Sequence, residues 1–424
     1  MKSLLLLIFI NATFISQAQK PKRILLNNGL VHIGNGEIVN NAVIGIEGKK
    51  ILFVKNALTY TLRKKEWDTI IDLNNQHVYP GFVAPNSTLG LTEIESVRAT
   101  NDFQEVGGLN PHIRALIAYN MDSKIIPTVR CNGVLLTQIC PRGGKITGTS
   151  SIMHLGGWNW EDAAVKIDDG IHVNWPEVMS GNSWGNKAKK KNETYGESKN
   201  ELGLFFEKAK VYAENVSRQD LDLRFNAMKE IFSGNKRVYF HANHIQQLLD
   251  IIEFSKKHGI KHSVIIGGYD SYLITERLRD ANIAIMLPRL HSLPSAEDDP
   301  IDLPYRLPYL LQEGGVKFCL QNEGDMEAMN ARNLPFLAGT AGSYGLSDEQ
   351  ALRSISLSAC EILGIEKDFG SIEVGKHATL FVSKGNALNM MTNDVSLILM
   401  DGEFYQTQNH QSDLYEKYKK KFGL

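Results

Sequence analysis

The chain has 424 residues, of which 43% are apolar and 22% are charged, with a formal net charge of −1. These values are ordinary for a soluble globular protein, and the length allows one large hydrophobic core or two smaller ones. The near-zero net charge argues against nucleic acid or an anionic membrane as a main partner, because proteins that bind those partners carry a basic excess.

Residues 1–18 have the pattern of a signal peptide. Lys2 provides a positive start, residues 4–10 are apolar, and Ser16-Gln17-Ala18 has the small residues of a cleavage site. A membrane anchor is the alternative, but this apolar run is shorter than the ~20 residues that cross a bilayer, and no later segment reaches that length. We therefore expect no stable membrane span and predict an exported protein, periplasmic or secreted, that is cleaved near Ala18.

Both ends of the mature chain show the alternation that is typical of β-strands. Residues 23–55 alternate between apolar and polar positions, and the pattern returns in the sequences IEVGKHATLFVSKG and DVSLILMDGEFY. We predict one small composite β-sandwich domain, built from residues 20–79 and 371–408. Residues 409–424 are predicted to form a polar tail.

The middle of the chain, residues 80–370, alternates short apolar runs with helix-length amphipathic segments. The apolar runs include GVLLTQI, RVYFHA, HSVIIGG, IAIML and VKFCLQ. The segment IQQLLDIIEFSKKHG, which follows His244, has apolar residues at a spacing of about 3.6 and ends in a basic turn before glycine, which indicates a helix. This alternation predicts an α/β fold with parallel strands joined by helices, as either an open sheet or a closed barrel.

The four cysteines are too few and too scattered for the disulfide framework of a small secreted fold. Cys319 and Cys360 lie in an apolar run and a helix-like stretch, and we predict that both are core residues. Cys131 and Cys140 could form a disulfide or remain free, because a sequence does not show whether two Cβ atoms meet.

The sequence YPGFVAPNSTLG enters a short strand through proline and glycine and opens into a polar loop at Asn86, Ser87 and Thr88. This entry resembles the first barrel strand of the amidohydrolase superfamily, in particular its branch related to imidazolonepropionase. The sequences NGVLLTQICPRGGKITG and GLSDEQALRSISLSACEILGIEKDFGSIEVGK resemble other parts of that branch, so the match spans nearly the whole mature chain. The resemblance implies a (β/α)8 TIM-type barrel over residues 80–370.

The resemblance also implies a catalytic metal site, but most of its ligand positions carry other residue types here. The His-x-His pair of the first strand falls on Asn86 and Thr88, the sixth-strand histidine falls on a glycine of VIIGGYD, and His241 falls on the fifth-strand histidine. A catalytic zinc typically needs about three protein ligands and an open position for water. We expect a degenerate metal site. Either His241 is the ligand of one divalent ion, with zinc as the first candidate, or the protein has no cofactor.

The activity that the resemblance implies is hydrolysis of a carbon–nitrogen bond in an amide or cyclic amide. His241 would bind a metal or polarise the carbonyl group, and Glu323 or Asp325 would move the proton. A rebuilt metal site would add His244 to these residues. In the alternative, His241 is a hydrogen-bonding histidine without a metal.

The candidates for substrate binding are residues expected near the mouth of the barrel: Asn86, Thr88, Glu93, Arg98, Trp158 and Trp160. Glu95 could face the same mouth. Arg98 could hold an anionic group by a bidentate contact, or it could form an ion pair with Glu93 or Glu95 that fastens the loop. The two tryptophans could stack on a ring-shaped ligand, or they could cover the barrel end as a flap or a partner surface.

Two functions from different classes stay open at this point. One is an exported hydrolase that acts on carbon–nitrogen bonds. The other is a catalytically inactive barrel that holds a small amide-like ligand or pairs with a relative whose metal site is intact. A homo-oligomer is a further expectation, whereas the sequence contains neither a Walker nor a Rossmann fingerprint for a nucleotide.

Overall fold

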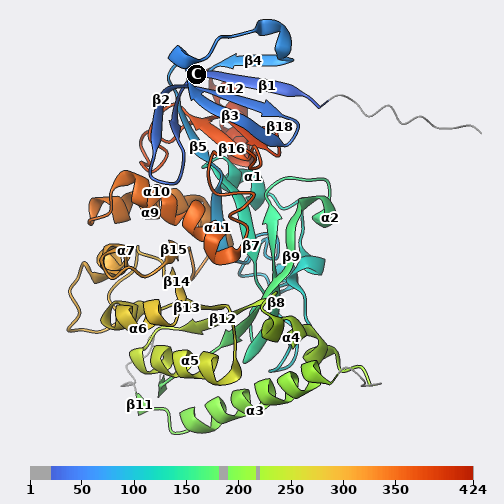
Figure 1. Ribbon diagram of the computed structural model, residues 1–424, viewed down its shortest axis with the longest axis vertical. Helices are drawn as coiled ribbons and strands as arrows, with labels where there is room; N and C mark the ends of the chain where they lie inside the picture. Colours follow the sequence, from blue (N-terminus) through green and yellow to red (C-terminus); the bar gives the residue numbers. More distant parts are fainter. Residues whose placement is uncertain (1–20, 181–189, 216–219, 424) are drawn as a thin grey trace, which may run out of the picture.

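A computed structural model describes residues 21–180, 190–215 and 220–423. The chain forms two large β-sheets, one above the other in Figure 1, with most of the helices packed around the lower sheet. The predicted signal peptide lies outside the described residues. Within the described ranges, none of the helices has the length and apolar character needed to cross a membrane.

The upper sheet, here called the terminal sheet, is built from both ends of the chain. Its strands are β1 (Arg23–His32), β2 (Ile38–Glu47), β3 (Lys50–Asn56), β4 (Thr69–Asp72), β5 (His77–Pro80), β16 (Leu380–Ser383), β17 (Val395–Met400) and β18 (Glu403–Tyr405). The order is β18-β17-β16-β5-β1-β2-β3, with β4 paired to β1. The two ends of the chain therefore meet where β5 and β16 pair in antiparallel fashion.

Period-two alternation explains why apolar residues cover both faces of the terminal sheet. Ile24 and Leu26 of β1 belong to one buried cluster, whereas Leu25 between them belongs to another, with Val43 and Trp67. Successive side chains of a strand point to opposite faces, so a strand that is apolar throughout needs a partner on each side. The composite β unit expected from both ends of the sequence is present in this sheet.

The lower sheet, here called the barrel sheet, has eight strands that curve into a nearly closed barrel (Figure 1). Its strands are β6 (Phe82–Ser87), β7 (Val134–Ile139), β8 (Ile146–His154), β9 (Ala164–Asn174), β12 (Arg237–Ala242), β13 (Ser263–Gly267), β14 (Ala284–Leu287) and β15 (Phe318–Leu320). The predicted α/β barrel is confirmed. One strand differs from the expected all-parallel pattern, because β8 runs antiparallel to both β7 and β9. Short connections suffice for such strands, whereas parallel neighbours need a longer crossover.

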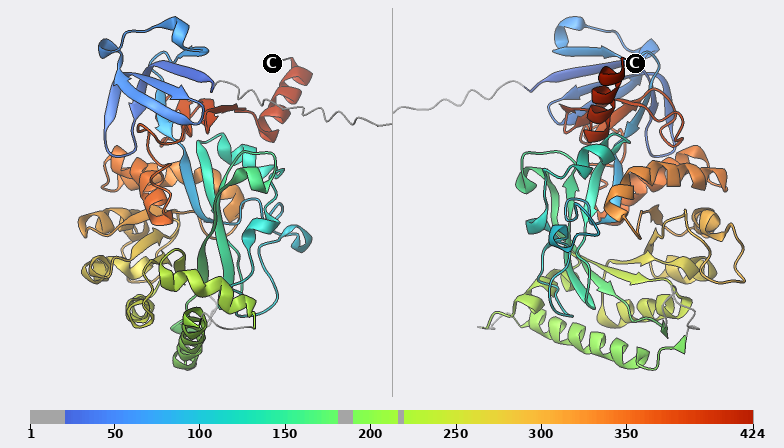
Figure 2. Two further views of the ribbon diagram at one scale, coloured as in Figure 1. Left: turned by 45° about the vertical axis from the view of Figure 1, so that its right-hand side comes forward. Right: turned by 180° about the vertical axis from the view of Figure 1, so that it is seen from behind.

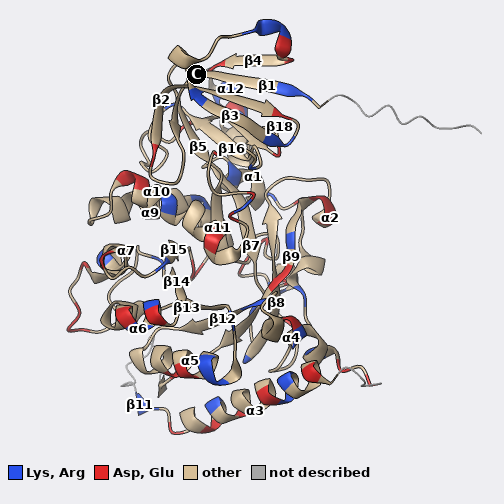
Figure 3. Cartoon of the chain, viewed as in Figure 1, with Lys and Arg blue, Asp and Glu red and all other residues tan. Residues whose placement is uncertain are grey.

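The helices of the middle of the chain pack on or near the barrel sheet. They are α1 (Ile125–Arg130), α2 (Trp160–Ala163), α3 (Tyr195–Glu214), α4 (Leu223–Ser233), α5 (Ile245–His258), α6 (Thr275–Asp280), α7 (Leu303–Glu313), α8 (Glu327–Asn330), α9 (Leu334–Ser343), α10 (Asp348–Ser354) and α11 (Leu357–Leu363). A short hairpin pairs β10 (Met179–Ser180) with β11 (Lys190–Lys191). The predicted helix after His244 is confirmed as α5, and Gly259 ends it in a left-handed conformation with φ 68°. Acidic and basic side chains alternate along α3, as the near-zero net charge suggests (Figure 3).

The interior of the barrel is packed, and α11 closes the end where the strands begin. Cys360 and Leu363 of α11 belong to the same buried cluster as Val83 of β6 and Met286 of β14. Cys360 and Cys319 are fully buried, as predicted for core residues. Cys131 and Cys140 are free thiols as well.

The predicted polar tail is a helix, α12 (His410–Phe422), which Asn409 caps at its start. It lies at the end of the molecule that holds the terminal sheet (Figure 2). The Thr128 hydroxyl of α1 donates a hydrogen bond of 2.8 Å to the Gln411 side chain. This contact ties the C-terminal helix to the barrel.

An aromatic cluster joins the two sheets. Phe381 of β16 stacks on Tyr79 of β5, with ring centroids 5.4 Å apart, and meets Phe82 of β6 edge to face at 4.9 Å. All three rings are buried. Gly133 lies so close that an added Cβ would come within 2.4 Å of the Phe381 ring. This packing anchors the first barrel strand, which leads into the polar loop at the barrel mouth.

We predict that Phe381→Ala lowers the free energy of unfolding by about 3–5 kcal/mol, because the buried ring leaves a cavity behind. The matched control is Phe422→Ala, since Phe422 is 67% exposed on α12. The control should change the stability by no more than about 0.5 kcal/mol. Chemical denaturation followed by circular dichroism measures both, and equal effects of the two variants would contradict the role of the aromatic cluster.

Candidate active site

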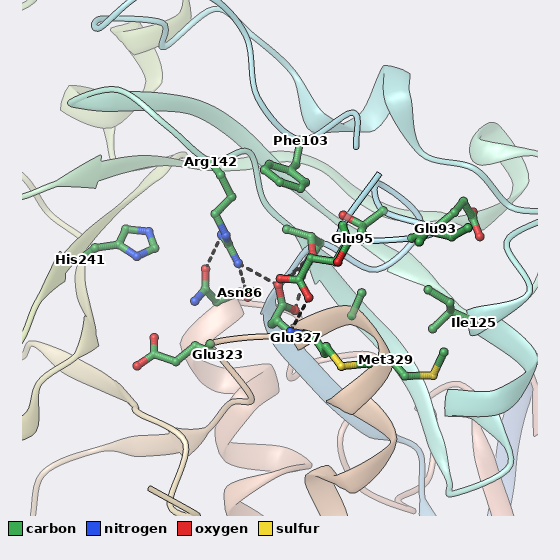
Figure 4. A pocket seen from close by; sticks show the side chains of 17 residues that line it. Asn86, Glu93, Glu95, Phe103, Ile125, Arg142, His241, Glu323, Glu327 and Met329 are labelled. Atoms are coloured by element: carbon green, nitrogen blue, oxygen red, sulfur yellow. Dashed lines mark hydrogen bonds and ion pairs between the residues drawn. The ribbon is translucent and has the colours of Figure 1, made fainter. Parts of the chain in front are cut away.

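A cavity of about 430 Å³, here called the mouth cavity, lies where the barrel strands end. Active sites of barrel enzymes lie at this face of the fold. Its polar lining consists of Asn86, Thr88, Thr92, Glu93, Glu95, Ser96, Arg142, His241, Glu323 and Glu327. Its apolar lining consists mainly of Ile94, Phe103, Ile125, Met326, Ala328 and Met329 (Figure 4).

Arg142, in the loop between β7 and β8, is the centre of a hydrogen-bonded network. Its guanidinium donates to the side-chain oxygen and the carbonyl oxygen of Asn86, both at 2.8 Å, and lies 3.2 Å from Glu327 Oε2. Glu327 also accepts hydrogen bonds from the backbone N–H and the hydroxyl of Thr88. Asn86 Nδ2 donates to Gln321 Oε1 at 2.7 Å. The two His-x-His positions are therefore held within one network (Figure 4).

The backbone at Asn86 explains how one residue offers two acceptors to the same guanidinium. Asn86 has φ 51°, in the left-handed region that asparagine adopts more readily than most residues. The register between β6 and β7 shifts between Ala84 and Ser87, which marks a bulge. The bulge presents both the side chain and the carbonyl group of Asn86 to Arg142.

His241, near the end of β12, lines the mouth cavity as a neutral histidine. Burial, together with the positive charge of Arg142, lowers the pKa of His241 to about 3. Its Nε2 lies 3.0 Å from Nδ1 of His172 on β9, which is fully buried. Burial also lowers the pKa of His172 well below its usual value, and the neighbouring His241 adds to this effect. Both rings are uncharged at neutral pH, so one of them donates a hydrogen bond to the other.

Glu323 lines the mouth cavity from the segment that follows β15. Burial raises the pKa of Glu323 above its usual range, while the hydrogen bond from Gln321 and the charge of Arg142 oppose this shift. The hydrogen bond joins Gln321 Nε2 to Glu323 Oε2 at 2.9 Å. A carboxyl group with a raised pKa in a cleft is a candidate for proton transfer.

The predicted substrate residues divide into two groups. Asn86, Thr88 and Glu93 line the mouth cavity. The other three, Arg98, Trp158 and Trp160, lie outside the cavity lining, so their assignment to the ligand site is corrected here. Arg98 donates to the carbonyl oxygen of Asn101 at 3.2 Å and forms no ion pair with Glu93 in the described structure.

The direction of β8 explains the position of the two tryptophans. Because β8 is antiparallel, the turn after it lies at the end of the barrel near the terminal sheet, where a Cβ on Gly156 would meet Met400 and Tyr405. Trp158 is 88% exposed there, and Trp160, which starts α2, packs partly buried against the core. The turn that carries both tryptophans is therefore at the opposite end of the barrel from the mouth cavity.

Two further candidates also have other positions than expected. Asp325 does not line the mouth cavity. It is exposed, and its backbone carbonyl oxygen accepts a hydrogen bond from the side chain of Asn330. His244 is the N-cap of α5, where its Nδ1 accepts a hydrogen bond of 3.2 Å from the backbone N–H of Gln246. The Nδ1 atom of His244 is already used in this helix cap, so His244 does not complete a rebuilt metal site with His241.

Comparison with known proteins identifies the family. The model of a family described as the amidohydrolase family matches residues 191–407, just over half of the chain. This chain belongs to the amidohydrolase family. The predicted resemblance is confirmed at this level, whereas the narrower branch related to imidazolonepropionase stays a prediction.

Individual relatives of this amidohydrolase-family chain are distant. The amidohydrolase tasK of Hapsidospora irregularis is 26% identical in an alignment of 391 residues that covers 82% of this chain and 38% of that protein. The chain thus spans well under half the length of this curated relative. An amidohydrolase from Thermotoga maritima MSB8 has a TM-score of 0.78 at 22% identity, covering 91% of this chain and all of the other. The ochratoxinase of A. niger has a TM-score of 0.57 at 14% identity, covering 91% and 96%. At these identities the two structures show the fold alone.

The residues of the mouth cavity do not fit the metal ion that the family resemblance implies. Within the described ranges, no group of three or more His, Cys, Asp or Glu side chains is arranged to hold a metal ion. The donors on the first strand are the amide of Asn86 and the hydroxyl of Thr88, which are already bonded in the network around Arg142. The Nε2 atom of His241 faces His172. Zinc in proteins is held by imidazole, thiolate or carboxylate groups, so the two side chains on the first strand are unsuitable ligands.

Sequence reasoning missed Arg142, His172 and Glu327. Arg142 follows the apolar run VLLTQI in the sequence CPRGG, and His172 lies near the end of the run GIHVN. Both positions are at or near strand ends, which is a signal that could have been used. Glu327 had no such signal, because it lies in a loop-like stretch and its partner Arg142 is 185 residues away.

We predict that Arg142→Met lowers the free energy of unfolding by about 3–5 kcal/mol, because it leaves the buried carboxylate of Glu327 without its cation. The pKa of His241 should rise in the same variant, since the positive charge that lowers it is removed. Denaturation and histidine NMR titration measure the two effects. The control is Arg114→Met, which breaks an ion pair with Asp168 that is more exposed, and it should cost at most about 1 kcal/mol. Equal losses would contradict the network, and the double variant Arg142→Met/Glu327→Gln should recover part of the stability.

The neutral state of His241 also predicts how stability depends on pH. In the unfolded chain His241 binds its proton near pH 6.5, whereas in the folded chain its pKa is about 3. The unfolded state therefore binds more protons in this window, so the free energy of unfolding falls as the pH falls from 6.5 toward 3. His241→Gln should flatten this dependence by up to about 1.4 kcal/mol per pH unit.

Urea denaturation at several pH values across this window tests the prediction. His410→Gln is the control, because His410 is exposed on α12. A slope in His241→Gln that equals the slope of the parent chain would show that His241 is not held neutral.

Proposed function

We propose that this amidohydrolase-family chain hydrolyses a carbon–nitrogen bond of a small amide-like molecule in the mouth cavity, without a metal ion of the family type. The observation that carries the proposal is the set of groups that face one cavity: a carboxyl group with a raised pKa, a neutral histidine and a fixed guanidinium. These are Glu323, His241 and Arg142. Their chemistry suits proton transfer and carbonyl polarisation.

Arg142 would hold the carbonyl oxygen of the substrate. A guanidinium has five N–H groups, and the network around Asn86 and Glu327 uses three of them. The others can bind an oxygen on which negative charge develops. The network keeps the guanidinium in place, so little reorganisation is needed when the substrate binds.

Glu323 would supply the proton that an amide nitrogen needs to leave. Water adds its oxygen to the carbonyl carbon, the carbon–nitrogen bond breaks, and the carboxyl proton of Glu323 goes to the nitrogen. A proton from the water then restores the carboxyl group. His241 is too weak a base to take that proton, because its pKa is about 3, and it acts instead as a neutral hydrogen-bonding group that orients the substrate.

A second candidate function is ligand binding without turnover. One observation favours it: the side chains at the His-x-His positions are bonded within a closed network rather than left available for a reaction. Such a barrel would hold a small amide-like molecule or act beside a relative with an intact metal site. Export through the predicted signal peptide and a homo-oligomer stay predictions under either function.

We expect the purified chain, prepared without a metal-chelating resin, to hydrolyse members of a panel of amides, cyclic amides and cyclic ureides. Glu323→Gln should lower kcat/KM by about 10²–10⁴-fold, the usual contribution of a general acid. Asp325→Asn should leave it unchanged, because the Asp325 side chain lies outside the mouth cavity. Activity should also fall as the pH rises through the raised pKa of Glu323, since the protonated form is the active one.

Two results would contradict this proposal. Turnover that depends on an added divalent metal and disappears with a chelator would assign the reaction to a metal centre. Saturable binding of an amide without any turnover would establish the binding function in place of the hydrolase.

A further inference from the structure

The charges of the mouth cavity are unequal. Besides Glu323, which the proposed reaction uses in its protonated form, three carboxylates line it, from Glu93, Glu95 and Glu327. Its lining contains one guanidinium, that of Arg142. His241 adds no positive charge at neutral pH, because burial keeps its pKa at about 3. A cleft lined by one sign of charge focuses the field and attracts ligands of the opposite sign.

The guanidinium neutralises one of these carboxylates and no more. In the part of the chain that the structure describes, Glu327 forms the ion pair with Arg142, at 3.2 Å. Glu93 and Glu95, which also line the cavity, form no ion pair with any described Lys, Arg or His. The excess negative charge of the mouth cavity is therefore left for a ligand to balance.

Neutral groups hold two of the remaining carboxylates in place. Glu93 accepts hydrogen bonds from Asn120 Nδ2 at 2.9 Å and from Ser123 Oγ at 3.0 Å. Glu95 accepts one from the backbone N–H of Met326 at 2.5 Å. These contacts fix the carboxylates without cancelling their charge. Figure 4 shows Glu95 in the middle of the lining, near Glu327, and Glu93 farther from Arg142.

Apolar side chains line the same cavity as these carboxylates. Phe103 and Ile125 offer apolar surface, and Phe103 also offers an aromatic ring.

We propose that the ligand of the mouth cavity is a cation, with an ammonium, amidinium or guanidinium group facing Glu95 and Glu93 and an apolar body against Phe103 and Ile125. The inference rests on the proposed function, because it takes the same cavity as the ligand site. It adds a statement about the charge of the substrate. An amidinium or guanidinium matches a carboxylate in a bidentate contact. An aromatic face beside the cation strengthens its binding. The substrate class is therefore a cationic amide.

The test uses three probes of one shape and different charge: benzamidine, benzamide and benzoate, with charges of about +1, 0 and −1 at neutral pH. Their dissociation constants for the purified chain are measured by titration calorimetry or ligand-observed NMR. We expect benzamidine to bind at least about tenfold more tightly than benzamide, and benzoate to bind most weakly. Raising the salt concentration should reduce the preference for benzamidine, because salt screens partly exposed charges.

Substitutions that keep the shape and remove the charge locate the site. Glu95→Gln should reduce the preference of the chain for benzamidine over benzamide. The double variant Glu93→Gln/Glu95→Gln should abolish it. Glu403→Gln is the control, since Glu403 is an exposed residue of β18 far from the mouth cavity in sequence and sheet. Thermal unfolding of each variant confirms that it folds before its affinities are compared.

Four outcomes would overturn the inference. The chain could bind benzamidine and benzamide equally, prefer benzoate, or bind none of the probes. The preference for benzamidine could also survive in the double variant. The binding test does not measure hydrolysis, so the two proposals fail separately. A chain that selects benzamidine but cleaves no amide loses the hydrolase proposal alone. A chain that cleaves amides but binds benzamidine no more tightly than benzamide loses the charge inference alone.

Discussion

The ion pair between Arg142 and Glu327 joins the barrel across its open seam. The barrel sheet ends at β6 and β15, and the described strands include no ladder between these two. At the mouth, side chains take the place of a ladder: Asn86 on β6 is bonded to Gln321 after β15, and Thr88 is bonded to Glu327. Arg142 binds the two sides together. Its ion pair with Glu327 adds a charged contact to these two hydrogen bonds.

The same cation also acts on the chemistry around it. Burial lowers the pKa of His241, and the charge of Arg142 lowers it further; the same charge limits the rise that burial produces in the pKa of Glu323. Burial drives both groups toward their uncharged forms, because a low-dielectric site disfavours a charge of either sign. A carboxyl group with a raised pKa and a neutral histidine then face one cavity.

The sequence predicted the parts of this fold that depend on local pattern. The barrel, the sheet built from both ends and helix α5 follow from periodicity and family resemblance, and so do the cavity positions of Asn86, Thr88, His241 and Glu323. The direction of β8 was missed because an apolar run carries no direction. The network was missed for a different reason. Charged residues in loops give no sign of their partners, and the 185 residues between Arg142 and Glu327 are bridged by the fold alone.

The pairing of β5 with β16 also sets an order of assembly. Strands β1 to β5 are synthesised first, but the edge of β5 that β16 covers stays open until some 300 residues more have been made. An unpaired strand edge is a template for pairing with other chains. Contacts between residues this far apart close late, because the loop entropy must be overcome first. Until the last strands arrive, Val78 and Tyr79 lack the partner strand that buries them, so the chain must remain protected from aggregation until its own C-terminus completes the sheet that its N-terminus began.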